Sequence, residues 1–287
     1  MNKNPFFYPT KSTFGQGSPD TAPASIPIQK EISPSFLEQE QKIELPTYDD
    51  PTAIEHQTIP GLTSIIIPAF FNNYPIFHQT GNCIGSIREH TDKEKTPYEI
   101  ILVINGNTGI TIDPKDSLCD KVVQNEENEG YSKAVNKGIR TSFGEYIAIV
   151  NNDVQVFDHW LEDMQEALKD LSLVMATPMY GKPYARAVEA NELREKGFGT
   201  PYSDFTDFSC VLTTKALFDE IGLFDEQFFM YGEDLDLLRR MTKEHKKYAS
   251  TKRVNTHHII GSTSSGVNET PEIMNESKRR LNEKWGY

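Results

Sequence analysis

The sequence predicts an α/β fold, in which helices flank an open and mostly parallel β-sheet. Two observations support this prediction: short continuous apolar runs, and amphipathic stretches of helical period that lie between them. Strands that helices cover on both faces read as continuous apolar runs, whereas half-exposed strands alternate apolar and polar residues. The chain of 287 residues is long enough to bury such a core within one large domain or two small ones.

The predicted strands are rich in β-branched residues, and the first of them ends at Pro68. They cover residues 63–67, 98–104, 121–124 and 146–150. Helices are predicted over residues 83–90, 131–142, 158–171, 213–221, 235–245 and 271–284. The clearest helix, at 158–171, repeats Leu161, Met164 and Leu168 at helical spacing. Alternating strands and helices imply a sheet whose crossovers are right-handed.

Residues 1–60 differ in composition from the rest of the chain. They hold nine of the 17 prolines, carry eight acidic against four basic side chains, and show no sustained apolar period. Such a segment buries too little apolar surface to offset the entropy lost on ordering. We therefore predict a proline-rich extended or flexible arm at residues 1–60 and one α/β domain at 61–287. The alternative is an arm that docks on the domain or on a second copy of the chain, as in a homo-oligomer.

Charge and cysteine content restrict the class of protein. The formal net charge is −13, whereas general nucleic-acid binding needs a basic face; a specific nucleic-acid acceptor stays open. Cys83, Cys119 and Cys210 lie far apart without a C-x-x-C pair, which favours a reducing compartment over a zinc ribbon or a disulfide framework. No apolar run approaches the roughly 20 residues of a membrane span, and no signal segment is recognised. The expectation is a soluble, cytoplasmic protein without an integral membrane segment.

A polar triplet directly follows the predicted strand 146–150. It consists of Asn151, Asn152 and Asp153. In open α/β sheets, ligands bind outside the carboxyl ends of the strands. A carboxylate in that place can hold a hard divalent cation that also takes oxygen ligands from a diphosphate. The alternative interpretation is a plain turn, because Asn and Asp are common turn residues.

Two carboxyl groups, those of Glu233 and Asp234, follow Gly232 near the predicted start of a helix. Carboxylates in a first helical turn are stabilised by the helix dipole, so the pair can be a simple N-terminal feature. The same dipole would also keep a carboxylate ionised and ready to act as a general base. The residue types alone leave both interpretations open.

Two further groups carry candidate ligands. His257 and His258 are adjacent, and adjacent residues of a strand point to opposite faces, so at most one of them reaches a given site. Together with Asp153, one histidine would give a metal shell of mixed oxygen and nitrogen. Gly130 allows close backbone approach, and Lys133 is within a few residues of it and could reach a phosphate. The alternative for this second group is a glycine-flanked amphipathic helix.

In their order and spacing, six segments resemble the family 2 glycosyltransferases, which have the GT-A fold, and within them the rhamnosyltransferase-like group. The segments are TSIIIPAF, EIILVINGNTG, NEENEGYSKAVNKGI, GEYIAIVNNDVQV, FDEQFFMYGEDLDLLRRM and HHIIGST, within about residues 62–262. The resemblance implies an inverting transfer of a hexosyl or deoxyhexosyl group from a nucleotide-sugar to an acceptor hydroxyl. Such a single displacement passes through an oxocarbenium-like state and needs no covalent nucleophile.

The resemblance also implies roles for individual residues. Asp153, at the position of the family's D-x-D element, would hold Mn²⁺ or Mg²⁺ on the diphosphate, and His258 would contact the metal or the diphosphate. Asp234 would remove the acceptor proton, with Glu233 orienting it or the acceptor. The residues expected to bind the nucleotide-sugar are Pro68, Ala69, Phe70, Asn105, Gly130, Lys133 and Asn152.

Two departures from the family pattern bear on the donor and the metal. Ile104 stands where the family has an acidic residue that contacts the base, so a UDP-, dTDP- or GDP-sugar remains open. Asn151 replaces the first acid of the D-x-D element, which removes one charge from the metal site. The acceptor, a glycan or another hydroxyl compound, is expected to bind near residues 178–207. The aromatic side chains of this stretch suit sugar stacking, and the alternative is that they belong to the core.

The sequence argues against two other classes of function. A non-catalytic module that binds nucleotide-sugars or glycans would keep the fold, but it would have no reason to keep Asp153, Glu233 and Asp234 together. A nucleotidyltransferase would need a glycine-rich basic loop after the first strand, where this chain has PAFFNNYP.

Overall fold

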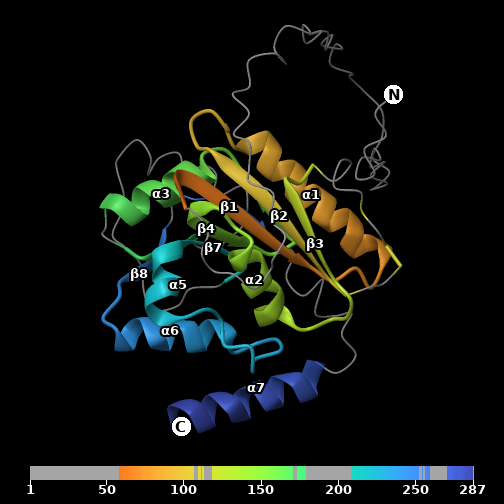
Figure 1. Ribbon diagram of the computed structural model, residues 1–287, viewed down its shortest axis with the longest axis vertical. Helices are drawn as coiled ribbons and strands as arrows, with labels where there is room; N and C mark the ends of the chain where they lie inside the picture. The colour runs from red at the N-terminus through yellow and green to blue at the C-terminus, as the bar shows by residue number, and fades with distance from the viewer. Residues whose placement is uncertain are drawn as a thin grey trace, which may run out of the picture. The chain divides into compact units, whose positions relative to one another are not determined.

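A seven-stranded β-sheet with the order β3-β2-β1-β4-β7-β6-β8 forms the centre of the protein. The computed structural model (Figure 1) describes residues 58–106, 109–110, 112, 118–170, 173–178, 208–251, 254, 256–258 and 270–286. Most neighbouring strands run parallel, and β7 is antiparallel to both of its neighbours, β4 and β6. The predicted open, mostly parallel sheet is confirmed.

The elements follow one another as strands and crossover helices in the first half of the chain. They are β1 (Ile59–Ala69), α1 (Tyr74–His90), β2 (Tyr98–Asn105), β3 (Lys121–Asn125), α2 (Tyr131–Arg140), β4 (Gly144–Val150), β5 (Val154–Val156) and α3 (Trp160–Asp170). The second half contains β6 (Met175–Pro178), β7 (Cys210–Thr214), α5 (Lys215–Ile221), α6 (Glu233–Lys243), β8 (Tyr248–Thr251), β9 (Thr256–His258) and α7 (Thr270–Trp285).

Helices cover both faces of the sheet, and alternate residues of β1 point to opposite faces. Ile65 and Ile67 pack in one apolar cluster with side chains of α1 and α3. Ile66 packs in a second cluster with side chains of α2, α5 and α6. All three isoleucines are fully buried, as the continuous apolar run predicts for a strand covered on both sides.

A small second sheet pairs β5 with β9 in antiparallel register. β5 begins immediately after Asp153, and β9 contains both histidines of the predicted pair. The two adjacent histidines thus lie within a strand. The pairing joins the end of β4 to a segment far along the chain and thereby completes the edge at which the site is predicted.

Several helices begin earlier than their sequence patterns suggest. α1 starts at Tyr74 rather than at residue 83, because the Asn73 side chain caps it by accepting the Ile76 N–H (3.0 Å). α6 starts at Glu233 rather than at residue 235, so both carboxyl groups of the acidic pair lie inside its first turn. β1 begins at Ile59, just ahead of the predicted domain boundary. Nearly all of the predicted arm and the stretch 179–207, predicted to shape the acceptor pocket, lie outside the described residues.

None of the described helices has the length and apolar character that crossing a membrane requires.

Candidate active site

The carboxyl ends of β1, β2 and β4 meet at one edge of the sheet. β1 lies between the other two strands, and its last residue, Ala69, pairs with Ile104 of β2. Pro68 and Ala69 are buried at this end, and Phe70 follows them with its ring against Gly106, where an added Cβ would lie 3.3 Å from the ring. The structure therefore brings the predicted nucleotide-pocket residues of the first two strands together.

Asp153 and His258 form a close pair at the same edge. β5 and β9 pair so that His258 lies opposite Val154, the residue after Asp153. His258 Nε2 lies 3.2 Å from Asp153 Oδ1, and the aspartate is only 5 % exposed. His257 lies opposite Gln155, one residue further along β5. Of the two adjacent histidines, His258 is thus the one that reaches the aspartate.

The donor atoms of this pair fit a divalent cation. A carboxylate oxygen and an imidazole nitrogen are ligands that Mn²⁺ accepts, and Mg²⁺ takes the oxygen. Within the described ranges, no group of three or more His, Cys, Asp and Glu side chains converges, so the pair would provide two protein ligands. An ion held in this way would keep coordination positions for diphosphate oxygens and water.

The side chains of the other two residues of the triplet form hydrogen bonds with neighbouring helices. Asn152 is buried, and its amide donates to Thr80 Oγ1 of α1 (3.0 Å). Asn151 Oδ1 accepts a hydrogen bond from the Tyr131 hydroxyl of α2 (3.1 Å). The side chain of Asn152 therefore anchors the turn to α1, and we expect a role in donor binding to fall to its main chain.

Glu233 and Asp234 begin α6 but lie in different environments. Glu233 is buried, whereas Asp234 is half-buried and its Oδ1 accepts the Leu235 N–H (2.7 Å). Burial, together with the neighbouring charge of Asp234, raises the pKa of Glu233 to about 8. At pH 7 the Glu233 carboxyl is therefore largely protonated, and Asp234 is the more accessible carboxyl group of the two.

Gly130 and Tyr131 connect the Asp153 side of the site to the Asp234 side. The Tyr131 N–H donates to the Phe229 carbonyl (2.6 Å), and its hydroxyl bonds Asn151 at the end of β4. Gly130 has a φ of +89°, and an added Cβ there would lie 2.6 Å from the Phe229 carbonyl oxygen. Glycine thus permits close backbone approach as predicted, although the nearby group in the structure is protein backbone.

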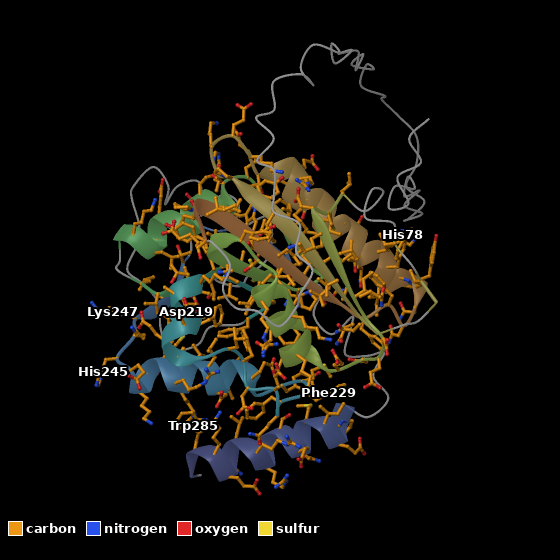
Figure 2. The ribbon with its side chains drawn as sticks, in the orientation of Figure 1. His78, Asp219, Phe229, His245, Lys247 and Trp285 are labelled. Carbon is orange, nitrogen blue, oxygen red and sulfur yellow. The ribbon has the colours of Figure 1, made fainter. Side chains whose placement is uncertain are left out.

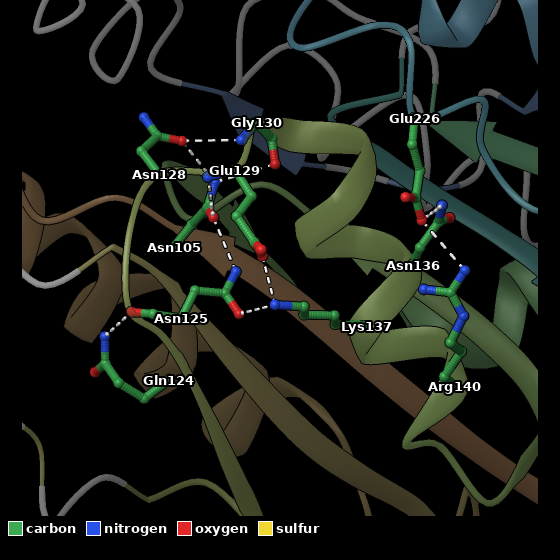
Figure 3. Close-up of polar contacts among 10 residues, drawn as sticks. All are labelled: Asn105, Gln124, Asn125, Asn128, Glu129, Gly130, Asn136, Lys137, Arg140 and Glu226. Carbon is green, nitrogen blue, oxygen red and sulfur yellow. Dashed lines mark hydrogen bonds and ion pairs between the residues drawn. The ribbon is translucent and has the colours of Figure 1, made fainter. Parts of the chain in front are cut away.

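Asn105 ends β2 and holds the loop that leads into α2 (Figure 3). Its Nδ2 donates to Asn128 Oδ1 (2.8 Å) and to the Gly130 carbonyl (3.0 Å). Its Oδ1 accepts from Asn125 Nδ2 (2.9 Å) and from the Glu129 N–H (3.1 Å). Both ends of the carboxamide are satisfied by protein, so we expect Asn105 to shape the nucleotide pocket rather than to bond the nucleotide.

A cavity of about 570 Å³ opens at the end of β3, beside this network. It is lined by Gln124, Asn125, Glu126, Glu127, Glu129 and Lys137. Lys137 forms an ion pair with Glu129 and donates to Asn125 Oδ1 (2.8 Å), which leaves the lining with an excess of negative charge (Figure 3). Such a lining repels phosphates, so we expect the donor diphosphate at the Asp153 end of the edge. Lys133, the predicted phosphate ligand, is exposed in the first turn of α2.

Two features of the site were missed from the sequence. Tyr131 belongs to the helix predicted over 131–142 and has no predicted role of its own, yet its hydroxyl and its N–H link the two halves of the site. Thr80, which holds Asn152, lies in the part of α1 that the sequence pattern did not reveal. Neither residue type carries a local signal for such a role.

The comparisons with known proteins agree with this architecture. The family model described as glycosyl transferase family 2 matches residues 64–221, more than half of the chain. The chain therefore belongs to glycosyl transferase family 2. The family predicted from the sequence motifs is thus confirmed.

Individual relatives are distant. This chain is 22% identical to an uncharacterized glycosyltransferase of Rickettsia bellii (strain RML369-C) over 202 residues. The match covers 68% of this chain and 29% of that protein. It is 29% identical to the glycosyltransferase GlyG of Streptococcus pneumoniae serotype 4 (strain ATCC BAA-334 / TIGR4) over 119 residues, 38% of this chain and 36% of that protein. The chain thus spans about a third of the length of these relatives.

A solved structure supports the fold. The crystal structure of GalNAc-T7 with UDP, GalNAc and Mn²⁺ superposes with a TM-score of 0.58 at 15% sequence identity. The match covers 78% of this chain and 48% of the GalNAc-T7 chain. This likeness, together with the family match, confirms the predicted GT-A fold.

Proposed function

We propose that this protein is an inverting, metal-dependent glycosyltransferase that moves a sugar from a nucleotide-sugar to an acceptor hydroxyl. The observation that carries the proposal is that the candidate metal ligands and the candidate base lie on separate elements. Asp153 Oδ1 and His258 Nε2 lie 3.2 Å apart after β4, and Asp234 lies in the first turn of a different element, α6. The motifs further favour the rhamnosyltransferase-like group, and with it transfer of a hexosyl or deoxyhexosyl group.

In this mechanism Asp234 accepts the proton of the acceptor hydroxyl as that oxygen attacks the anomeric carbon. The new bond between the acceptor oxygen and the anomeric carbon forms while the bond from that carbon to the diphosphate oxygen breaks. The bonding electron pair leaves with the nucleoside diphosphate, and one displacement inverts the configuration. Glu233, largely protonated at pH 7, can donate a hydrogen bond and thereby orient Asp234 or the acceptor.

Asp153 and His258 are the residues that would hold a divalent cation. When bound, Mn²⁺ or Mg²⁺ would offset negative charge on the leaving nucleoside diphosphate. The hydrogen bonds of Asn151 and Asn152 to Tyr131 and Thr80 fix the turn that carries Asp153. The carboxylate is thereby oriented before any ligand arrives, which reduces the cost of binding.

The identity of the donor base depends on the end of β2. Ile104 is buried there (1 % exposed), at the position of the family's acidic base contact. A buried aliphatic side chain cannot form a hydrogen bond with a nucleotide base. Recognition of the base must therefore come from other groups, and UDP-, dTDP- and GDP-sugars are all candidate donors. The acceptor would be a glycan or another hydroxyl compound, which approaches from the Asp234 side.

The test begins with a thermal-shift screen of nucleotide-sugars in the presence of Mn²⁺, to identify the donor. Release of nucleoside diphosphate is then measured for wild type, Asp234→Asn, Asp153→Asn and the control Asp219→Asn, which alters an exposed side chain on α5 (Figure 2). General-base catalysis contributes about 100- to 10,000-fold, so Asp234→Asn should lose that much turnover and keep its donor affinity. Asp153→Asn should weaken Mn²⁺-dependent donor binding, and Asp219→Asn should match wild type.

Three outcomes would contradict the proposal. Wild-type turnover in Asp234→Asn would reject the base assignment. Donor binding that is unchanged by EDTA would reject the cation. A protein that binds donors but releases no nucleoside diphosphate with any of them would instead be a binding module that keeps the fold.

A further inference from the structure

The C-terminal helix α7 bonds the main chain of the segment that carries Glu233 and Asp234. Ser277 Oγ donates to the Met230 carbonyl (2.9 Å), and Arg280 donates to the Gln227 carbonyl (2.6 Å). Both acceptors precede α6 in residues 225–236, which we call the base segment. α7 therefore holds the base segment in the stretch just ahead of the acidic pair.

Two residues at the end of α7 bond carboxylates at the two limits of the base segment. Lys284 Nζ lies 2.6 Å from Asp225 Oδ2 and 2.7 Å from Asp236 Oδ1. Trp285 Nε1 donates to the same Asp236 Oδ1 (3.0 Å), and Figure 2 shows Trp285 between α6 and α7. A single lysine thus connects the first and last residues of the base segment, with the catalytic pair between them.

Asp236 makes the docking of α7 a requirement rather than an accessory contact. Its side chain is fully buried, at 0 % exposure. A buried carboxylate is stable only when charged or hydrogen-bonding partners compensate for the lost water. On α6 itself Arg240 supplies one such partner (2.9 Å), and Lys284 and Trp285 of α7 supply two more.

The α7 residues that make these contacts share one face of the helix. Ser277, Arg280 and Lys284 follow one another at spacings of three and four residues, which is the helical period. Trp285 lies eight residues after Ser277 and thus borders the same face. Leu281 belongs to the same face, and an added Cβ on Gly232 would lie 3.1 Å from its Cδ1. Gly232 immediately precedes Glu233. This face of α7 therefore contacts the base segment from Asp225 to the start of α6.

From this geometry we infer that α7 is a positioning element for the catalytic base. By fixing residues 225–236 through Ser277, Arg280, Lys284 and Trp285, it sets where the Asp234 carboxylate stands relative to the donor. The inference rests on the proposed function, because it assigns a purpose to contacts around the proposed base. It gives α7 no contact with substrate and no role in donor binding.

The test compares full-length variants in two measurements. Trp285→Phe removes the indole N–H, Lys284→Met removes the charge, and Lys284→Arg keeps it. The matched control is Arg279→Ala. Among the described residues Arg279 pairs with Glu276 and Glu283 of its own helix and with no residue of the base segment, and its side chain is 55 % exposed. Amide hydrogen exchange of residues 226–236 reports the anchoring, and steady-state kinetics with the identified donor report the positioning.

We expect faster exchange in the base segment for Trp285→Phe and Lys284→Met, with exchange in β1 and β4 unchanged. A displacement of about 1 Å at a reacting group can cost about 100-fold, so a tenfold or larger fall in kcat is expected, with the donor KM unchanged. Lys284→Arg should recover most of the loss, and Arg279→Ala should match wild type. If Trp285→Phe does not fold, Ser277→Ala provides a milder loss at the same segment.

Unchanged exchange in both anchor variants would overturn the anchoring. Faster exchange with wild-type kcat, or a loss confined to the donor KM, would overturn the positioning role. A wild-type protein that releases no nucleoside diphosphate would contradict the proposed function instead, and the exchange measurement would still decide whether α7 holds the base segment.

Discussion

At the scale of single residues, neighbouring carboxyl groups can differ sharply in charge because they differ in burial. Glu233 is buried at the start of α6, and the adjacent Asp234 is half-buried. Burial and the charge of Asp234 raise the pKa of Glu233 to about 8, against an ordinary value of 4.5. One residue of the pair is thus suited to donate a hydrogen bond and the other to accept a proton, at the same pH.

This difference predicts a pH dependence of stability. The folded protein keeps the Glu233 proton up to about pH 8, whereas the unfolded chain loses it above about pH 4.5. The unfolded state therefore binds fewer protons in this window, and the free energy of unfolding falls as pH rises, by up to about 1.4 kcal/mol per pH unit. Glu233→Gln, which cannot ionise, should lose less stability between pH 5 and pH 8 than wild type does. Urea unfolding at several pH values measures this slope.

The exposed substitution Asp219→Asn serves as its control and should keep the wild-type slope. Equal slopes for Glu233→Gln and wild type would mean that Glu233 ionises normally in the folded protein, and its assignment as a hydrogen-bond donor would then fail.

At the scale of elements, apolar runs predicted the strands well, because burial on both faces leaves a strong local pattern. The run 98–104 corresponds to β2, Tyr98–Asn105, in which every residue is buried. The pairing of β5 with β9 left no such pattern: each strand has three residues, and their partners lie about a hundred positions apart in the sequence. The sequence therefore predicted Asp153 and His258 as candidate ligands, but the distance between them follows only from tertiary structure.

The start of α1 was missed because its signal is local and ambiguous. The residues Asn72, Asn73 and Pro75 are as typical of turns as of a helix start. In the structure Asn73 is the N-cap of α1, and its side chain accepts the Ile76 N–H (3.0 Å). The extra turns gained in this way bring Thr80 to Asn152, beside the predicted metal site.

The cap predicts a measurable loss of stability. Replacing an Asn N-cap by Ala costs about 1 kcal/mol, so Asn73→Ala should lower the melting temperature by about 2–4 °C for a domain of this size. Asn82→Ala is the matched control, since Asn82 is exposed within the same helix and alanine favours helix there. Thermal unfolding of both variants distinguishes the cap from a general effect of removing an asparagine; a drop as large in Asn82→Ala would contradict the assignment.

At the scale of the whole molecule, charge and composition divide the chain. The first 60 residues carry eight acidic and four basic side chains, so −9 of the net charge of −13 belongs to the rest. Part of that surplus consists of the carboxylates of Asp153 and Asp234 at the candidate site. Glu233 counts in the formal charge, although its raised pKa of about 8 leaves it largely protonated at pH 7. The excess negative charge argues against general nucleic-acid affinity but not against a specific acceptor. The arm, the cytoplasmic location and the oligomeric state stay predictions from composition.

Removal of residues 1–57 tests the arm directly, because the truncated chain still begins ahead of β1 at Ile59. A segment that buries little apolar surface contributes little to stability. The truncated protein should therefore melt within about 2 °C of the full chain, a shift that corresponds to less than about 1 kcal/mol for a domain of this size. Its donor affinity should also be unchanged. A larger loss of melting temperature with unchanged mass in sedimentation would mean that the arm docks on its own domain. A change from an oligomer to a monomer would mean that it docks on a second copy, and either result would replace the flexible arm by a docked one.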